Sequence, residues 1–172
     1  THTYITPGLA TLDIPQDLTS YLAQDKTFDS SDLFKSSVAD FNVQGKQYAL
    51  PRETTATILI YNKDLFAKAG VAEPTADWKW SDYAAAAQKL TSGDGPSKIW
   101  GTGGWPNPPY IYPADVRVWQ EGGDIVSKDR TTYTLDQDPG VKAFQWISDL
   151  IHKSQVHVSA TATQGTNVND LF

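Results

Sequence analysis

The sequence predicts an α/β layer fold, and three observations support this prediction. Runs rich in β-branched and aromatic residues alternate with runs of helical periodicity, no internal repeat is present, and glycines follow several of the helical runs. At 172 residues with 40% apolar side chains, the chain is long enough to bury a substantial core. Alternating strands and helices favour a sheet covered by helices over a β-sandwich or a helix bundle.

The N-terminal region is predicted to hold a short helical turn and one longer helix. Residues 1–27 mix turn formers with a series of apolar residues, which indicates a loop that leads into the helical turn. The serines at 30–31 can cap a second helix, because apolar residues then recur at steps of three and four up to Phe41. This helix is expected to end before Gly45.

Two strands are predicted after a turn at Gly45-Lys46. Segments 47–50 and 55–61 are rich in β-branched and aromatic residues, which suit a pleated, half-buried surface. Pro51 lies between them and removes one backbone donor. We therefore expect two strands with a kinked junction.

Capping chemistry locates the next two helices. Asn62 can accept hydrogen bonds from the first turn of a helix over 63–69, and Gly70 then supplies the left-handed residue that ends it. A helix over 81–90 contains a run of alanines, the residue with the highest helix propensity, and glycines follow it. A short strand over 99–102 is expected after these glycines.

The segment 103–113, GGWPNPPYIYP, is predicted to be a shaped loop. Its four prolines remove backbone donors and restrict φ, so no regular element continues through it. A helix over about 114–120 is expected next, with glycines at 122–123 ending it. A short strand at 125–126 should then form a hairpin with 132–135.

The longest helix is predicted to begin at Asp138-Pro139, which places an N-cap residue before a proline at the first helical position. Five apolar residues follow on one face at helical spacing, and we expect this stripe to face the core. They are Val141, Phe144, Ile147, Leu150 and Ile151. Beyond Lys153 the sequence becomes polar and small, which is typical of a loop.

Charge and composition exclude several classes of function. The net charge is −6, the pI is near 4.9, and no cluster of Lys and Arg is present, which disfavours a nucleic-acid partner. The absence of Cys excludes disulfides and thiol catalysis, and the three His residues lack acidic partners at ligand spacing. The sequence therefore predicts no metal and no cofactor.

The aromatic residues point to a kind of ligand. Six Trp and eight Tyr suit an amphipathic ligand such as a sugar, although most of them taken singly are expected to be core or surface anchors.

Four blocks of the sequence resemble, in order, the signature blocks of family 1 extracellular solute-binding proteins. Residues 48–51 and 58–70 are similar to the pattern Y-x-L-P … L-x-Y-N-K-D-L-F-x-x-A-G, and residues 80–91 to W-x-x-Y-x-x-A-A-x-K-L-T. Residues 119–124 resemble W-x-x-G-G-D, and the helix around 144–151 resembles the long helix that follows in the family. The resemblance runs from about Gly8 to the last residue.

This resemblance implies a particular architecture. Family members have two α/β lobes of the type II periplasmic-binding-protein fold, each with a mixed sheet flanked by helices, and bind the ligand in the cleft between them. Residues 1–46 would form the edge of the first lobe and the approach to the hinge, and residues 47–172 the main part of the second lobe. The first hinge crossing would lie near 50–53. We expect the chain to be a fragment, because members normally have further lobe-forming segments before and after it.

The resemblance also implies a function without catalysis. The protein would be the extracytoplasmic component of an ABC importer that captures a carbohydrate and delivers it to the membrane permease, acting as a monomer. Binding would shift the population toward a closed form. A lipid anchor upstream of the fragment and free diffusion in the periplasm are both open. A single lobe would keep only part of the ligand contacts, so the 172 residues alone are expected to bind weakly or not at all.

Eight residues are candidate ligand contacts, because a sugar needs aromatic platforms together with hydrogen-bonding groups. They are Trp105, Tyr110 and Tyr112 in the proline-rich segment, Arg52, Glu53 and Thr55 at the proposed crossing, and Trp119 and Asp124 after it. By resemblance, Tyr112 falls near an aromatic position that faces sugar, Thr55 matches a polar ligand-contact position, and the 119–124 block shapes the floor of the cleft. The plainer alternatives are that the loop aromatics cover the lobe's own apolar surface and that Arg52 and Glu53 form an exposed ion pair.

The sequence also allows other roles for some of these residues. Trp78 and Trp80 are expected to attach the start of a helix to the lobe and to take no part in binding. Glycoside hydrolysis would need two carboxylates across one cleft, such as Glu53 and Glu121, but nothing in the sequence marks them as buried or paired. A non-sugar solute such as a polyol phosphate, or a protein partner that binds exposed aromatics, remains an alternative.

Overall fold

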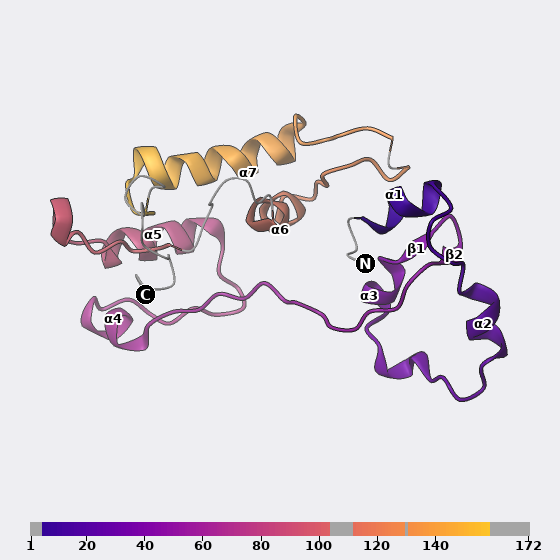
Figure 1. Ribbon diagram of the computed structural model, residues 1–172. Coiled ribbons are helices and arrows are strands. Elements are labelled where there is room, and N and C mark those ends of the chain that lie inside the picture. Colours follow the sequence, from indigo (N-terminus) through magenta and orange to yellow (C-terminus); the bar gives the residue numbers. More distant parts are fainter. Residues whose placement is uncertain (1–4, 104–111, 130, 159–172) are drawn as a thin grey trace. The chain divides into compact units, whose positions relative to one another are not determined.

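The contacts of the chain divide it into two units, residues 1–58 and 59–172 (Figure 1). The computed structural model describes residues 5–103, 112–129 and 131–158. The unit boundary lies between Ile58 and Leu59. This division does not test the lobe boundary expected after residue 46. The assignment of residues 1–46 to one lobe and 47–172 to the other stays a prediction.

The first unit is built from short helices and one hairpin. Its elements are α1 (Thr6–Thr11), α2 (Thr19–Gln24), the 3₁₀ turn η1 (Ser30–Asp32), α3 (Lys35–Ala39), β1 (Asn42–Val43) and β2 (Lys46–Gln47). The strands pair antiparallel across a two-residue turn in which Gln44 and Gly45 both have positive φ, at 52° and 84°. A two-residue hairpin turn of this kind matches the twist of the flanking strands. The turn thus lies one residue earlier than predicted.

Gln47 is the polar side chain that ties the first unit together. It is buried, its side-chain amide donates to the carbonyls of Val38 (2.9 Å) and Ala49 (2.7 Å), and its backbone carbonyl accepts from Leu18 (2.7 Å). The backbone N–H of Gln47 in turn donates to the Thr19 hydroxyl (3.0 Å). These bonds hold α2, α3 and the hairpin in one arrangement, because a buried amide must be satisfied to be tolerated.

Two predictions for the first unit are wrong. The helix expected from 30 to 41 forms as the separate pieces η1 and α3, because Leu33 and Phe34 have extended backbones and Phe34 is exposed. The strands expected over 47–50 and 55–61 are absent apart from Gln47 in β2, since no described residue forms a β-bridge with residues 48–62. The side chains of Ile58, Leu59 and Ile60 are accordingly exposed.

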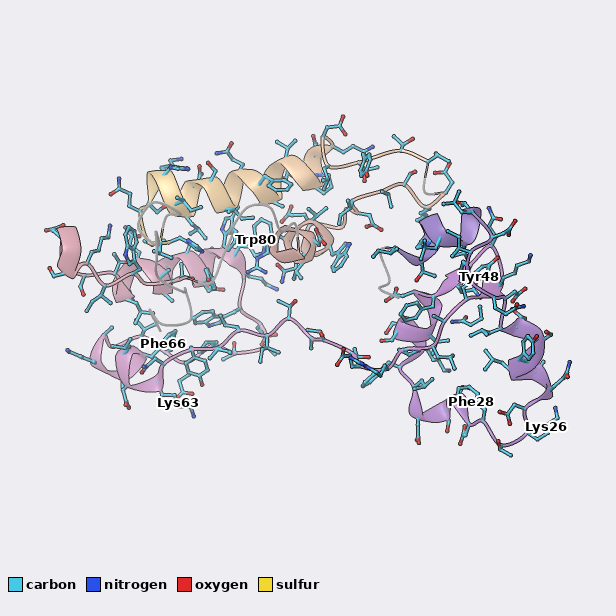
Figure 2. All side chains as sticks on the ribbon, viewed as in Figure 1. Lys26, Phe28, Tyr48, Lys63, Phe66 and Trp80 are labelled. Carbon is cyan, nitrogen blue, oxygen red and sulfur yellow. The ribbon has the colours of Figure 1, made fainter. Side chains whose placement is uncertain are left out.

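Helix α4 (Lys63–Lys68) begins and ends as its capping residues predict. The Asn62 side chain accepts hydrogen bonds from the backbone N–H groups of Asp64 (3.0 Å) and Leu65 (3.1 Å). Gly70 follows with a φ of 63°. The Phe66 side chain, labelled in Figure 2, is buried and packs between Tyr61 and Trp78, with ring centroids 5.1 and 6.2 Å away.

Helix α5 (Trp80–Leu90) packs through its alanines, and its start is one residue earlier than predicted. The Asp82 carboxylate accepts a hydrogen bond from the backbone N–H of Lys79 (2.8 Å) and so caps the first turn. A 3₁₀ turn, η2 (Gly95–Ser97), follows. The strand expected at 99–102 is reduced to two isolated bridges, an antiparallel one from Ile99 to Ser92 and a parallel one from Thr102 to His157.

Helix α6 (Tyr112–Gln120), helix α7 (Asp138–Ser148) and its π-helical continuation η3 (Asp149–Lys153) complete the second unit. The hairpin predicted between 125–126 and 132–135 is confirmed by an antiparallel bridge from Val126 to Tyr133. Figure 1 shows α7 running next to α5 and α6. The core combines Ala87, Leu150 and Val156 with the flanking rings of Tyr83 and Trp146.

The structure does not describe the side chains of the predicted proline-rich loop, apart from Gly103.

The predicted apolar stripe of the last helix is confirmed at Ile147 and Leu150 and wrong at Val141 and Phe144. Val141 and Phe144 are 53% and 42% exposed, whereas Gly140, Ala143, Ile147 and Leu150 are buried. Gly140 packs against the preceding segment so closely that a Cβ there would lie 2.2 Å from the Leu135 carbonyl oxygen. Small residues let two backbones approach closely. The sequence prediction missed Gly140 and Ala143 because it counted only large apolar side chains. The helix also begins one residue earlier than predicted, with Gln137 as its N-cap residue.

Candidate ligand-binding site

Trp119 and Asp124 are the two predicted site residues that the second unit brings together. The Trp119 indole Nε1 donates a hydrogen bond to Asp124 Oδ1 at 3.1 Å. The same carboxylate oxygen accepts from the backbone N–H of Ile125 at 2.8 Å. Trp119 is 54% exposed, so about half of its surface is open to solvent while its indole N–H is held by Asp124.

The two glycines after α6 make this pairing possible. Gly122 has a φ of 79°, a conformation that costs glycine little, and its N–H donates to the Trp119 carbonyl at 2.9 Å. Gly123 donates to the Val118 carbonyl at 2.9 Å and lies against α7, where a Cβ would be 2.5 Å from Pro139 Cβ. The chain therefore turns back sharply after α6 and returns Asp124 to Trp119.

The other side of α6 is anchored in the second unit. Val118 is completely buried, and the Arg117 guanidinium lies 5.8 Å from the Trp146 ring centroid. Burial lowers the pKa of Arg117 below its usual value. Trp80, labelled in Figure 2, packs on Trp146 with ring centroids 4.8 Å apart and donates its indole N–H to the Gln120 side-chain oxygen at 2.9 Å. Helix α6 is thus fixed at the end that carries Trp119.

Trp78 and Trp80 have the structural role that the sequence predicts for them. Trp78 stacks on Phe66 of α4, and Trp80 links the first residue of α5 to the last residue of α6. Their rings hold helices together, in contrast to the open ring of Trp119.

Arg52, Glu53 and Thr55 belong to the first unit, and all three are exposed. Arg52 and Glu53 form an ion pair at 2.9 Å, with side chains 88% and 74% exposed. A pair this open to water contributes little to stability. Both groups are accessible to a ligand, and a ligand-binding role for these three residues stays a prediction.

The aromatic residues of the proline-rich segment receive no structural test. Trp105 and Tyr110 lie outside the described residues, and Tyr112 is the first residue of α6 with a side chain that is not described. Their proposed contact with a ligand stays a prediction.

Asp115 is a residue that the sequence interpretation missed. It lies on α6 one turn before Trp119, and its Oδ1 atom is buried without a hydrogen-bond partner in the described part of the chain. Burial raises the pKa of the Asp115 carboxyl, and the neighbouring charge of Asp124 raises it further. The spacing of Asp115 and Trp119 on a predicted helix was the signal that could have drawn attention to it.

The described ranges show neither a metal site nor a membrane-spanning helix. They contain no group of three or more potential metal-binding side chains, and none of their helices is long and apolar enough to cross a membrane. His157 is buried in the core beside a small cavity lined by Tyr83, Trp146, Ile147 and Leu150, which makes it part of the packing of the second unit.

Comparison with solved structures shows which class of fold this chain has. An ABC substrate-binding protein from Listeria monocytogenes, solved in complex with cycloalternan, superposes with a TM-score of 0.75 at 35% identity, over 97% of this chain and 42% of that one. The GacH receptor of Streptomyces glaucescens, solved with and without acarbose, superposes with a TM-score of 0.63 at 26% identity, over 95% of this chain and 39% of that one. The chain is α/β with the type II periplasmic-binding-protein fold and corresponds to part of such a protein.

Comparison with protein families places the chain in one of them. The family model of bacterial extracellular solute-binding proteins matches residues 5–172, and the chain belongs to this family. An arabinooligosaccharide-binding protein of Halalkalibacterium halodurans is 30% identical over 74% of this chain. The chain spans about a third of the length of the curated relatives that it matches. The resemblance inferred from the sequence blocks is confirmed.

Proposed function

We propose that this chain contributes to an extracytoplasmic receptor that captures a carbohydrate between two lobes and delivers it to the permease of an ABC importer. The family consists of extracellular solute-binding proteins, and relatives are named for binding arabino-oligosaccharides or were solved with cycloalternan and acarbose. The family and these relatives are binding proteins, which supports a role without catalysis.

The observation that carries the proposal is the open indole of Trp119. A sugar presents a face of C–H groups that stacks on an aromatic ring and a rim of hydroxyls that needs donors and acceptors. The Asp124 carboxylate holds the indole N–H, so the ring keeps one orientation before a ligand arrives. A preorganised platform reduces the side-chain entropy lost on binding.

The remaining predicted contacts complete the proposal. Tyr112, Trp105 and Tyr110 would supply further aromatic surface, while Arg52, Glu53 and Thr55 would supply hydrogen-bonding groups. Arg52 and Glu53 each offer several donor or acceptor atoms, and both are accessible. Their weak mutual ion pair can be exchanged for bonds to hydroxyls at little cost.

Thermal-shift screening of the complete encoded protein tests the proposal. The panel contains cycloalternan, arabino-oligosaccharides, mannobiose, acarbose, simple monosaccharides and glycerophosphocholine. A probe at 100 times its Kd stabilises the native state by about 2.7 kcal/mol, which raises the melting temperature measurably. We expect a selective response to one class of saccharide, confirmed by calorimetry, and loss of uptake of that saccharide when the gene is deleted.

Two variants separate a sugar platform from a general aromatic surface. Trp119→Ala should raise the Kd for the responding saccharide about 10- to 100-fold, which is typical of the loss of a central aromatic contact. Tyr133→Ala, which removes another exposed ring from the second unit, should leave the Kd unchanged. A response to glycerophosphocholine alone would replace the carbohydrate by a phosphorylated polyol. No response to any probe would reject the carbohydrate proposal in favour of a different solute or a protein partner.

A further inference from the structure

Three side chains on α6 and just after it are linked by spacing and contacts: Asp115, Trp119 and Asp124. Asp115 and Trp119 are four residues apart on this helix and therefore neighbours on one face. Asp124 bonds to the indole of Trp119, and its charge also acts on the Asp115 carboxyl. Two carboxylates and an open aromatic ring thus lie together.

The two carboxylates differ in how well they are satisfied. Asp124 Oδ1 accepts from the Trp119 indole and from the backbone N–H of Ile125. Asp115 Oδ1 is removed from solvent and accepts from no donor among the residues that the structure describes. A desolvated acceptor without a donor is unfavourable, and native proteins leave few of them unless a ligand, water or ion completes the set.

We propose that Asp115 accepts a hydrogen bond from a hydroxyl of the carbohydrate that stacks on Trp119, and so is a further ligand contact of this receptor. The inference rests on the proposed function. A hydroxyl is a suitable donor because it is neutral and can stack its carbon neighbours on the adjacent ring. A metal ion is a poor candidate, because the described residues contain no group of three or more potential metal-binding side chains.

The proposal makes an unusual combination of predictions for the variants. Asp115→Asn keeps the size of the side chain and removes its charge, and Asp115→Ala removes the acceptor. Because Asp115 Oδ1 has no hydrogen-bond partner among the described residues, neither variant should lower the melting temperature substantially. Both should weaken binding, by about 10-fold for the asparagine variant and more for alanine, in line with a hydrogen bond to a charged group. A purely structural role would give the opposite pattern, with a lower melting temperature and little change in Kd.

Calorimetry on the complete encoded protein tests this with cycloalternan, an arabino-oligosaccharide and acarbose as probes. Glu121→Gln is the matched control, because it removes a negative charge from an exposed residue directly after α6. The inference is supported if the wild-type protein binds a saccharide, the Asp115 variants weaken it as stated, and Glu121→Gln does not. It is overturned, with the proposed function intact, if the Asp115→Ala and wild-type Kd values agree within twofold while Trp119→Ala still weakens binding.

Choline serves as a final probe, because two carboxylates beside an indole could also hold a cationic group. Binding of choline that depends on Asp115, together with no binding of any saccharide, would overturn both the inference and the carbohydrate proposal. Binding of a neutral saccharide without choline binding supports both.

Discussion

Replacement of Gly123 by alanine should destabilise the second unit through a single added methyl group. The new Cβ would lie 2.5 Å from Pro139 Cβ and 3.1 Å from both Pro139 Cγ and Val118 Cγ1. Neither neighbour can move easily, because Pro139 belongs to the rigid first turn of α7 and Val118 is completely buried. The start of α7 must therefore move away from the end of α6.

The size of the effect follows from the cost of overpacking. Inserting a methyl group into a filled site costs about 1–3 kcal/mol. The second unit spans residues 59–172, and for a unit of this length 1 kcal/mol lowers the melting temperature by roughly 4 °C, so Gly123→Ala should lower it by about 4–12 °C. Displacing residue 123 also displaces Asp124, which should break its bond to the Trp119 indole and weaken binding of the responding saccharide.

A second glycine supplies the control for this prediction. Gly8 lies in α1, and a Cβ there would meet no atom within 4 Å. Gly8→Ala should leave stability unchanged or increase it by up to about 1 kcal/mol, because alanine favours the helix. Differential scanning calorimetry of the complete encoded protein compares the two variants. Equal melting temperatures for Gly123→Ala and Gly8→Ala would refute the close packing between α6 and α7.

Three further variants test other contacts. Asn62→Ala should destabilise α4 by about 1 kcal/mol in urea unfolding, whereas Asn62→Asp, which can still cap, should differ little from wild type; equal losses would contradict the capping role. Trp80→Phe keeps the packing on Trp146 but loses the bond to Gln120, at a cost of roughly 0.5–1.5 kcal/mol, and adding Gln120→Ala should then cost little more. Burial lowers the pKa of His157 from 6.5, so below pH 6.5 the unfolded chain binds the proton more readily and stability falls. Unfolding between pH 8 and 5 should show this loss in the wild type and a smaller one in His157→Gln; identical pH profiles would exclude His157 as its source.

The elements that were predicted well depend on local chemistry. Asn62 and Gly70 define α4 through bonds and a backbone conformation that involve only adjacent residues. The W-x-x-G-G-D block likewise acts within six residues, since both glycines serve the turn that pairs Trp119 with Asp124. Such signals can be interpreted correctly without knowledge of the rest of the fold.

The elements that were predicted poorly depend on partners elsewhere. A β-branched run such as 55–61 shows that a segment can pair, but pairing needs the backbone of a second segment, and none of the described residues supplies it. Asp115 was overlooked for a related reason. An unsatisfied acceptor is defined by what surrounds it in three dimensions, and the sequence shows only that an Asp precedes a Trp by one helical turn.

Three glycines explain why the packing of the second unit could not be predicted from apolar patterns alone. A Cβ at Gly101 would lie 1.8 Å from the Ala87 carbonyl oxygen, one at Gly140 would lie 2.2 Å from the Leu135 carbonyl oxygen, and one at Gly123 would meet Pro139. Each contact is an approach between segments that any side chain would prevent. The positions of α5, α6 and α7 therefore depend on where side chains are missing as much as on where large ones are buried. Because Trp119 lies at the end of α6, a change at these glycines should reach the candidate site through the backbone even though only Gly123 lies next to it.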